Sequence, residues 1–164
     1  MPDPASQPRL THLDETGAAR MVDVTAKSPT VRTASATAFV ACSPLIVAAL
    51  RDGSVPKGDV LAVARVAGIA AAKRTPELLP LAHVIGVHGC AVDLVVEEEG
   101  VRISATVRTA DRTGVEMEAL TAATVAGLAI VDMVKGVDRG VSLREARVTA
   151  KSGGRSGDWV RPAD

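Results

Sequence analysis

The segment from Thr113 to Lys135 restricts the folds open to this chain more than any other part of the sequence. It opens with Thr113-Gly-Val-Glu116, a T-x-x-E capping box in which two side chains would satisfy free amides at the start of a helix. The residues that follow, to about Val137, are apolar on almost every side of that helix. Such a helix must be covered by a sheet on one face and by something else on the other, for which a second subunit is a natural cover.

The remaining sequence predicts strands and shorter helices around this segment. Residues 31–42 are largely β-branched or small, and Ser43-Pro44 is a typical helix start, with proline at the first helical position. In chain order we expect a strand over 31–42, helices over 44–50 and 57–74, strands over 87–97 and 101–110, the long helix, and a strand over 143–150. This order is the split β-α-β pattern of an α+β, ferredoxin-like fold with an additional helix, in which helices pack on an antiparallel sheet.

Length and composition indicate one domain. A chain of 164 residues with 47% hydrophobic residues can bury a single core of ordinary size. We expect a flexible N-terminal tail over residues 1–9, a single domain over 10–150 and a mobile glycine-rich segment over 151–164. The N-terminus lacks the layout of a signal peptide, and we expect no membrane span because no sufficiently long apolar run is free of charges.

The charges and the rare residue types exclude several classes of function. Nineteen basic residues balance nineteen acidic ones, so no overall field draws the chain to nucleic acid or to a membrane surface. Phe39 and Trp159 are the only aromatic residues, too few for a base-stacking platform. Cys42 and Cys90 form no C-x-x-C pair, which favours a reduced, cytoplasmic setting over a disulfide scaffold.

Charged residues near both ends of the long helix are candidates for chemistry. Glu118 and Asp132 lie 14 positions apart, so they point within about 40° of each other but lie about 21 Å apart along the helix axis. This spacing predicts two separate sites per helix, each completed by another subunit if the chain works as an oligomer. Asp132 and Lys135, at i and i+3, can form an acid–base pair. Solvated helix ends and an ordinary surface ion pair are the alternative interpretations.

Other polar residues stand out singly. Lys57, beside Gly58-Asp59, would add an amine to helix-start amides that attract phosphate, unless it is simply a solvated loop lysine. His83, a lone polar residue after an apolar loop, is either functional or a hydrogen-bonded core histidine. His83 and His88 have no carboxylates at metal-ligand spacing, so we expect no metal site. The basic residues that could form a local cluster are Lys27, Arg32, Lys73, Arg74, Lys151 and Arg155.

Several short motifs together resemble one known family across nearly the whole chain. They are Leu10-Thr-His12, Met21-Val-Asp-Val-Thr-Ala-Lys27, Lys57-Gly-Asp59, Ala72-Lys-Arg-Thr75, residues 113–122, Asp132-Met-Val-Lys135 and Lys151-Ser-Gly-Gly154. The chain resembles the MoaC family, the cyclic pyranopterin monophosphate synthases of molybdenum cofactor biosynthesis. The resemblance implies a ferredoxin-like homohexamer, a trimer of dimers, with active sites at subunit interfaces. It also implies conversion of 3′,8-cyclo-7,8-dihydroguanosine triphosphate to cyclic pyranopterin monophosphate and diphosphate, without a redox cofactor.

The resemblance also implies roles for individual residues. Asp132 and Lys135 would be the catalytic pair, and Lys57 would be a further catalytic amine. The positions that contact or bind the substrate would be Leu81, Ala82, His83, Met117, Glu118, Arg32 and Lys151. Breaking a phosphate ester and closing a cyclic phosphate need cationic stabilisation and positioned acid–base groups, which these residue types can supply.

The chain departs from the family's usual pattern at a few positions. The family's Leu-Cys-His-Pro loop reads Leu81-Ala82-His83-Val84 here, and Val131 and Gly136 stand where a tyrosine and an alanine are usual. A loop without proline and a helix end with an extra glycine should be less rigid. A low-activity paralogue and a ferredoxin-like regulatory module that binds a nucleotide without converting it are therefore the alternative interpretations.

Overall fold

The computed structural model describes residues 13, 14 and 16–163. The expected tail over residues 1–9 and the motif Leu10-Thr-His12 lie outside the described residues. The elements in chain order are β1 (Thr30–Ala41), α1 (Pro44–Asp52), α2 (Val60–Ala72), α3 (Thr75–Leu78), β2 (Gly89–Val96), β3 (Gly100–Asp111), α4 (Glu116–Val134), β4 (Ser142–Ser152) and β5 (Trp159–Val160). The predicted order of strands and longer helices is confirmed, while the sequence patterns do not predict the short elements α3 and β5.

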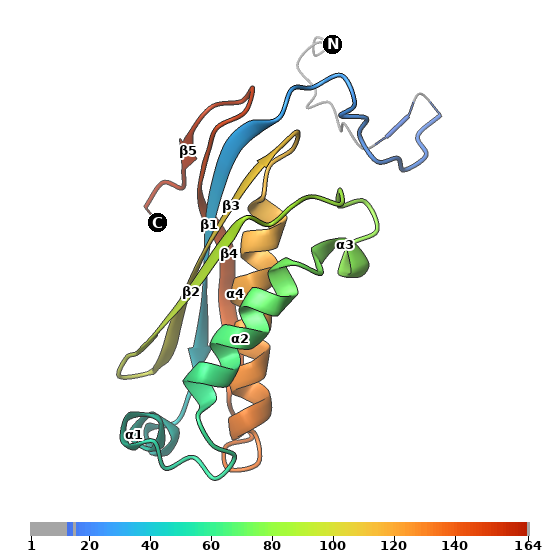
Figure 1. Cartoon of the computed structure of the whole chain (residues 1–164). Helices are drawn as coiled ribbons and strands as arrows, with labels where there is room; N and C mark the ends of the chain where they lie inside the picture. The colour runs from blue at the N-terminus through green and yellow to red at the C-terminus, as the bar shows by residue number, and fades with distance from the viewer. Residues whose placement is uncertain (1–12, 15, 164) are drawn as a thin grey trace, which may run out of the picture.

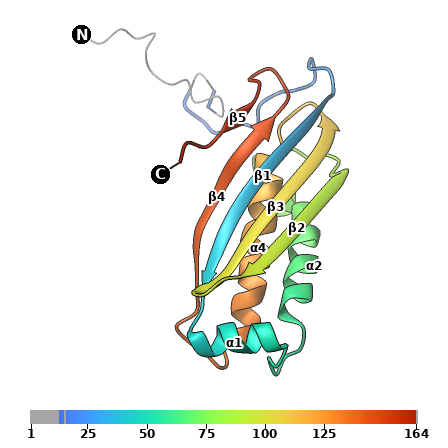
Figure 2. The same cartoon turned by 90° about the vertical axis from the view of Figure 1, so that its left-hand side faces the viewer.

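The strands form one antiparallel sheet in the order β2-β3-β1-β4-β5. Its first four strands have the ferredoxin-like arrangement, in which β1 and β3 are central and each αβ unit adds an outer strand. In Figure 2 the sheet faces the viewer, and α2 and α4 lie behind it. The predicted α+β architecture, with helices packed on an antiparallel sheet, is confirmed.

Helix α4 is the centre of the hydrophobic core. It packs on β1, β3 and β4 on one side and on α2 on another (Figure 1). The contact with α2 is close, because a Cβ added to Gly68 would lie 2.8 Å from the Ala122 carbonyl oxygen. Helix α2 of the same chain therefore supplies part of the cover that the sequence pattern assigned to a second subunit. By length and composition α4 could also cross a membrane, but its packing between sheet and α2 accounts for its apolar character.

Two of the predicted helix starts are wrong. Helix α4 begins at Glu116 with Val115 at the N-cap position and no side-chain cap, so Thr113 does not cap it. Helix α2 begins at Val60 rather than at residue 57, because the Asp59 side chain accepts a hydrogen bond from the Ala62 N–H and sets the start there. Lys57 consequently lies in the turn before α2, which leaves its long side chain free to reach another element.

The C-terminal residues continue the sheet beyond the predicted boundary. Strand β4 runs to Ser152, and β5 pairs with it through Ala150↔Val160 and Lys151↔Trp159. Between the two strands Gly153 has φ +84°, and a Cβ there would lie 2.3 Å from the Val31 carbonyl oxygen. Only glycine fits this turn, which brings the end of β4 against the start of β1.

Candidate active site

Three charged residues meet at the C-terminal end of α4. The Lys135 Nζ lies 2.6 Å from Asp132 Oδ1. Lys57, from the turn before α2, donates a hydrogen bond from Nζ to the Asp132 carbonyl oxygen at 2.9 Å and lies 3.8 Å from Asp132 Oδ2. We call these residues the lysine–aspartate cluster. All three side chains are more than half exposed, so the two amines face solvent where a ligand can approach.

The cluster has the electrostatics of an anion-binding acid–base site. The hydrogen bond and charge of Lys135, followed by the charge of Lys57, hold the pKa of Asp132 below its ordinary range. Asp132 is therefore ionised at neutral pH and orients both ammonium groups. An ordinary surface pair joins two residues of one helix, whereas Lys57 comes from 75 positions away. That convergence favours a built site over the surface-pair interpretation.

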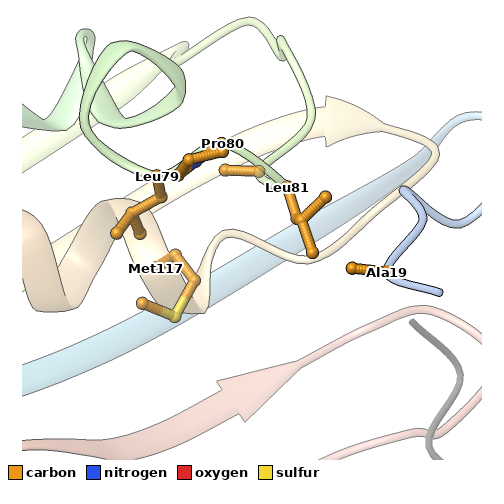
Figure 3. Close-up of a pocket in the computed structure, with 6 residues that line it drawn as sticks. Ala19, Leu79, Pro80, Leu81 and Met117 are labelled. Atoms are coloured by element: carbon orange, nitrogen blue, oxygen red, sulfur yellow. The ribbon is translucent and has the colours of Figure 1, made fainter. Parts of the chain in front are cut away.

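An apolar pocket of about 710 Å³ lies at the opposite end of α4. Figure 3 shows the loop after α3 arching over the start of α4, with Leu79 beside Met117 and the Leu81 side chain pointing toward Ala19. The residues that line the pocket are Ala19, Leu79, Pro80, Leu81, Ala82 and Met117. Three predicted substrate-contact residues, Leu81, Ala82 and Met117, are thus brought together from two distant segments.

Glu118 and His83 lie on the two segments that line most of this pocket, the start of α4 and the loop after α3. Glu118 is only 3% exposed, and burial above all raises its pKa, with the neighbouring Glu116 adding to the rise and His83 opposing it. His83 is half-buried, and its Nε2 lies 2.6 Å from the Val22 carbonyl oxygen. This contact fixes the orientation of the imidazole ring. It is compatible with a functional histidine and with a hydrogen-bonded core histidine.

The raised pKa of Glu118 gives a testable pH dependence. Ionising a buried carboxylate destabilises the fold, so the stability that neutral Glu118 contributes is lost as pH rises from 4.5, its ordinary value, through the raised folded-state pKa. Glu118→Gln should therefore melt increasingly above the wild type as pH rises from 4.5 towards neutrality. Thermal denaturation across that range measures the difference. Glu98→Gln, at an exposed turn position, is the control. If the difference in melting temperature from the wild type does not change with pH for either variant, the assignment is contradicted.

Arg32 and Lys151 also lie at this end, on neighbouring strands β1 and β4. Arg32 donates from Nε to the Asp111 carbonyl oxygen at 3.0 Å and from Nη2 to that of Arg112 at 3.2 Å. Lys151 Nζ lies 3.8 Å from Glu116 Oε1 and is hydrogen-bonded to Ser156. Of the other basic residues expected to join a cluster, Arg74 instead pairs with Glu77.

The predicted site residues thus form two groups at opposite ends of α4. Asp132, Lys135 and Lys57 are at one end, and the pocket, Glu118, Arg32 and Lys151 are at the other. The helix separates the groups by about 21 Å. The predicted separation of the polar ends is confirmed, and one small ligand cannot touch both groups of a single chain.

The structure gives Glu116 and Asp138 contacts that the sequence does not predict. Glu116 approaches Lys151 instead of capping α4. Asp138 accepts a hydrogen bond from the Ser43 N–H at 3.0 Å. The sequence Asp138-Arg-Gly140 is typical of a turn, but only the fold reveals the contact between Asp138 and Ser43.

The two cysteines supply no activated nucleophile. Cys42 and Cys90 are free and half-buried. Burial, followed by the charge of Asp138, raises the pKa of Cys42 to about 11, and burial raises that of Cys90. Both thiols are therefore protonated at neutral pH and are poor nucleophiles. The described residues contain no group of three or more His, Cys, Asp or Glu side chains placed to hold a metal ion.

Similarity to known proteins identifies the family of this chain. The sequence model of the MoaC family matches residues 21–154. The chain belongs to the MoaC family. Several similar proteins bear the name cyclic pyranopterin monophosphate synthase. The protein from Streptomyces avermitilis is 58% identical over 98% of this chain and 94% of its own length, and that from Nocardioides is 58% identical over 94% and 96%. The Geobacter metallireducens protein is 53% identical over 93% of this chain and 96% of its own length.

Proposed function

We propose that this chain is a cyclic pyranopterin monophosphate synthase, a lyase of molybdenum cofactor biosynthesis. It converts (8S)-3′,8-cyclo-7,8-dihydroguanosine 5′-triphosphate to cyclic pyranopterin monophosphate and diphosphate. The observation that carries the proposal is the cluster of Lys57, Asp132 and Lys135 in a chain whose relatives bear that name over almost their full length.

The lysine–aspartate cluster suits the phosphate chemistry of this reaction. Loss of diphosphate and closure of a cyclic phosphate both place developing negative charge on phosphate oxygens, which two solvent-facing ammonium groups can stabilise. Lys135 and Lys57 are also the groups that can deliver or accept a proton, and Asp132 holds both amines in place. No step requires an electron sink, so the proposal includes no redox cofactor.

The other end of α4 suits binding of the substrate's body. The apolar pocket beside Met117 and Leu81 can accept a flat ring system, and Glu118 and His83 offer polar contacts beside it. Arg32 and Lys151 add positive charge that attracts the triphosphate. These roles divide the site into a binding group and a reacting group.

The separation of the two groups supports an oligomer with shared sites. Because about 21 Å divides them in one chain, we propose that each active site joins the lysine–aspartate cluster of one subunit to the pocket of another. A homohexamer, as a trimer of dimers, provides such interfaces. Exposed apolar side chains on α4, Met117 in its first turn at 42% and Leu128 in its second half at 52% exposure, are consistent with contacts of this kind. We also propose a cytoplasmic location, without nucleic acid or membrane as a partner.

The experiment that tests the function is direct turnover by the purified protein. The cyclic dihydro-GTP substrate is incubated with the wild type, and mass spectrometry follows the substrate and the cyclic monophosphate product. We expect complete conversion with repeated turnovers. Binding of the substrate without any product would contradict the proposal and would support the regulatory, nucleotide-binding alternative.

A further inference from the structure

Asp138, outside the lysine–aspartate cluster, joins the two chain segments that carry the cluster's amines. Its Oδ2 accepts a hydrogen bond from the backbone N–H of Ser43 at 3.0 Å, across 95 positions of sequence. Its Oδ1 accepts a hydrogen bond from the Gly140 N–H at 2.8 Å, within the turn that follows α4. One carboxylate thus ties the C-terminal end of α4 to the start of α1.

Both of these segments lead directly to the cluster. Lys135 ends α4, and the Asp138 N–H bonds back to the Val134 carbonyl oxygen at 3.0 Å, so the turn between them is short and continuous. Lys57 follows α1, in a turn closed by the hydrogen bond from the Gly58 N–H to the Val55 carbonyl oxygen at 3.0 Å. A shift of α1 against the end of α4 would therefore move Lys57 relative to Lys135.

The cluster needs such support because burial does not hold it. The side chains of Lys57, Asp132 and Lys135 are 52%, 62% and 58% exposed. Gly136 directly follows Lys135, and no atom lies within 4 Å of the position its Cβ would occupy. Its φ is not positive, so alanine fits this backbone and glycine serves only to loosen the turn.

We propose that Asp138 is a positioning residue for the reaction: its hydrogen bond to the Ser43 N–H keeps Lys135 and Asp132 aligned with Lys57. The inference rests on the proposed function, because alignment of the amines is read out as turnover. Asp138 acts as a fixed acceptor and transfers no proton. The hydrogen bonds from Ser43 and then Gly140 hold its pKa below the ordinary range, so it remains ionised at neutral pH.

The hydrogen bond can be removed from either side with little change in shape. Asp138→Asn is isosteric, but its single amide oxygen cannot accept from both N–H groups. Ser43→Pro deletes the donor, and Ser43 already has φ −67°, within the range of proline. Ser43→Ala is the matched comparison for the backbone donor, because it keeps the N–H and removes only the serine hydroxyl, whose interaction with Asp138 is weaker than that of the N–H.

The variants are compared by kcat and KM for the cyclic dihydro-GTP substrate. We expect Asp138→Asn and Ser43→Pro each to lower kcat about tenfold and to leave KM within about twofold, because misplaced reacting groups cost rate more than binding. Both changes together should cost no more than either alone, and Ser43→Ala, which keeps the backbone N–H, should keep most of the wild-type kcat. Gly136→Ala should restore part of the lost kcat of Asp138→Asn by stiffening the turn.

Several results would overturn the proposal. These are a kcat within about twofold of the wild type in Asp138→Asn, losses that multiply in the double variant, or an equal loss in Ser43→Ala. If Ser43→Pro does not fold, the kcat of the isosteric variant Asp138→Asn alone tests the proposal. Wild-type turnover, measured in parallel, separates this inference from the proposed function. The NMR signal of dimethylated Lys135 needs no turnover. Asp138→Asn should shift this signal more than Ser43→Ala does, because Ser43→Ala keeps the backbone N–H. An unchanged signal in Asp138→Asn would also refute the alignment.

Discussion

Lys135→Ala is expected to lower kcat about 10²- to 10⁴-fold, the usual contribution of a positioned acid–base group. Asp132→Asn should cause a loss of similar order, because the amide keeps the shape of the carboxylate but not the charge that orients both amines. Both residues are exposed, so neither change should affect folding. Steady-state kinetics measure the loss, and circular dichroism with a thermal melt shows whether the fold remains.

The chain offers a matched control for this pair. Arg74 and Glu77 form another i, i+3 ion pair of comparable exposure, with a separation of 2.8 Å between Arg74 Nη2 and Glu77 Oε2. Glu77→Gln breaks that pair away from the lysine–aspartate cluster and should leave kcat within about twofold of the wild type. Near-normal turnover by Lys135→Ala would remove this lysine from the reaction.

Two inactive variants are expected to restore each other's activity when their subunits are mixed. Lys135→Ala damages the reacting end of α4, and Lys151→Ala damages the binding end. If each site takes its two ends from different subunits, some sites in a mixed oligomer contain neither substitution. After random exchange of equal amounts, about one quarter of the sites should be intact and turnover should return to about that fraction of the wild type.

The control for this experiment uses two substitutions at the same end. Subunits with Lys135→Ala and subunits with Asp132→Asn both damage the lysine–aspartate cluster, so no mixture of them contains an intact cluster beyond the residual activity of each variant. Mass spectrometry of the intact oligomer verifies that subunits have exchanged. Equal, unrestored activity in both mixtures would show that each site lies within one subunit.

Local patterns in the sequence predict much of the fold because they reflect local physics. Residues 113–135 are apolar on almost every side of a helix, which requires a core helix, and α4 is that helix. The capping box failed for a tertiary reason: Glu116 lies near Lys151, which approaches from β4. Lys57 was misplaced because Asp59, two residues later, is the stronger helix cap. Both errors concern helix starts: a local cap sets the start of α2, and a residue from a distant strand approaches the start of α4.

The part of the candidate site that depends on local spacing was predictable from the sequence. Asp132 and Lys135 pair through helix spacing alone, and that spacing is visible in the sequence. The approach of Lys57 to Asp132 and of Asp138 to Ser43 depends on how α1 meets the end of α4, which no periodicity encodes. Likewise, the pocket forms where the loop after α3 crosses the start of α4, a contact between segments distant in sequence.

One assay tests directly whether this chain itself carries out the synthase reaction. Purified wild-type protein is given the cyclic dihydro-GTP substrate, and the diphosphate released is compared with the pterin product, which oxidation makes fluorescent. We expect repeated turnover with equal amounts of diphosphate and pterin product. Intact substrate after prolonged incubation, or diphosphate release without the pterin product, would contradict it.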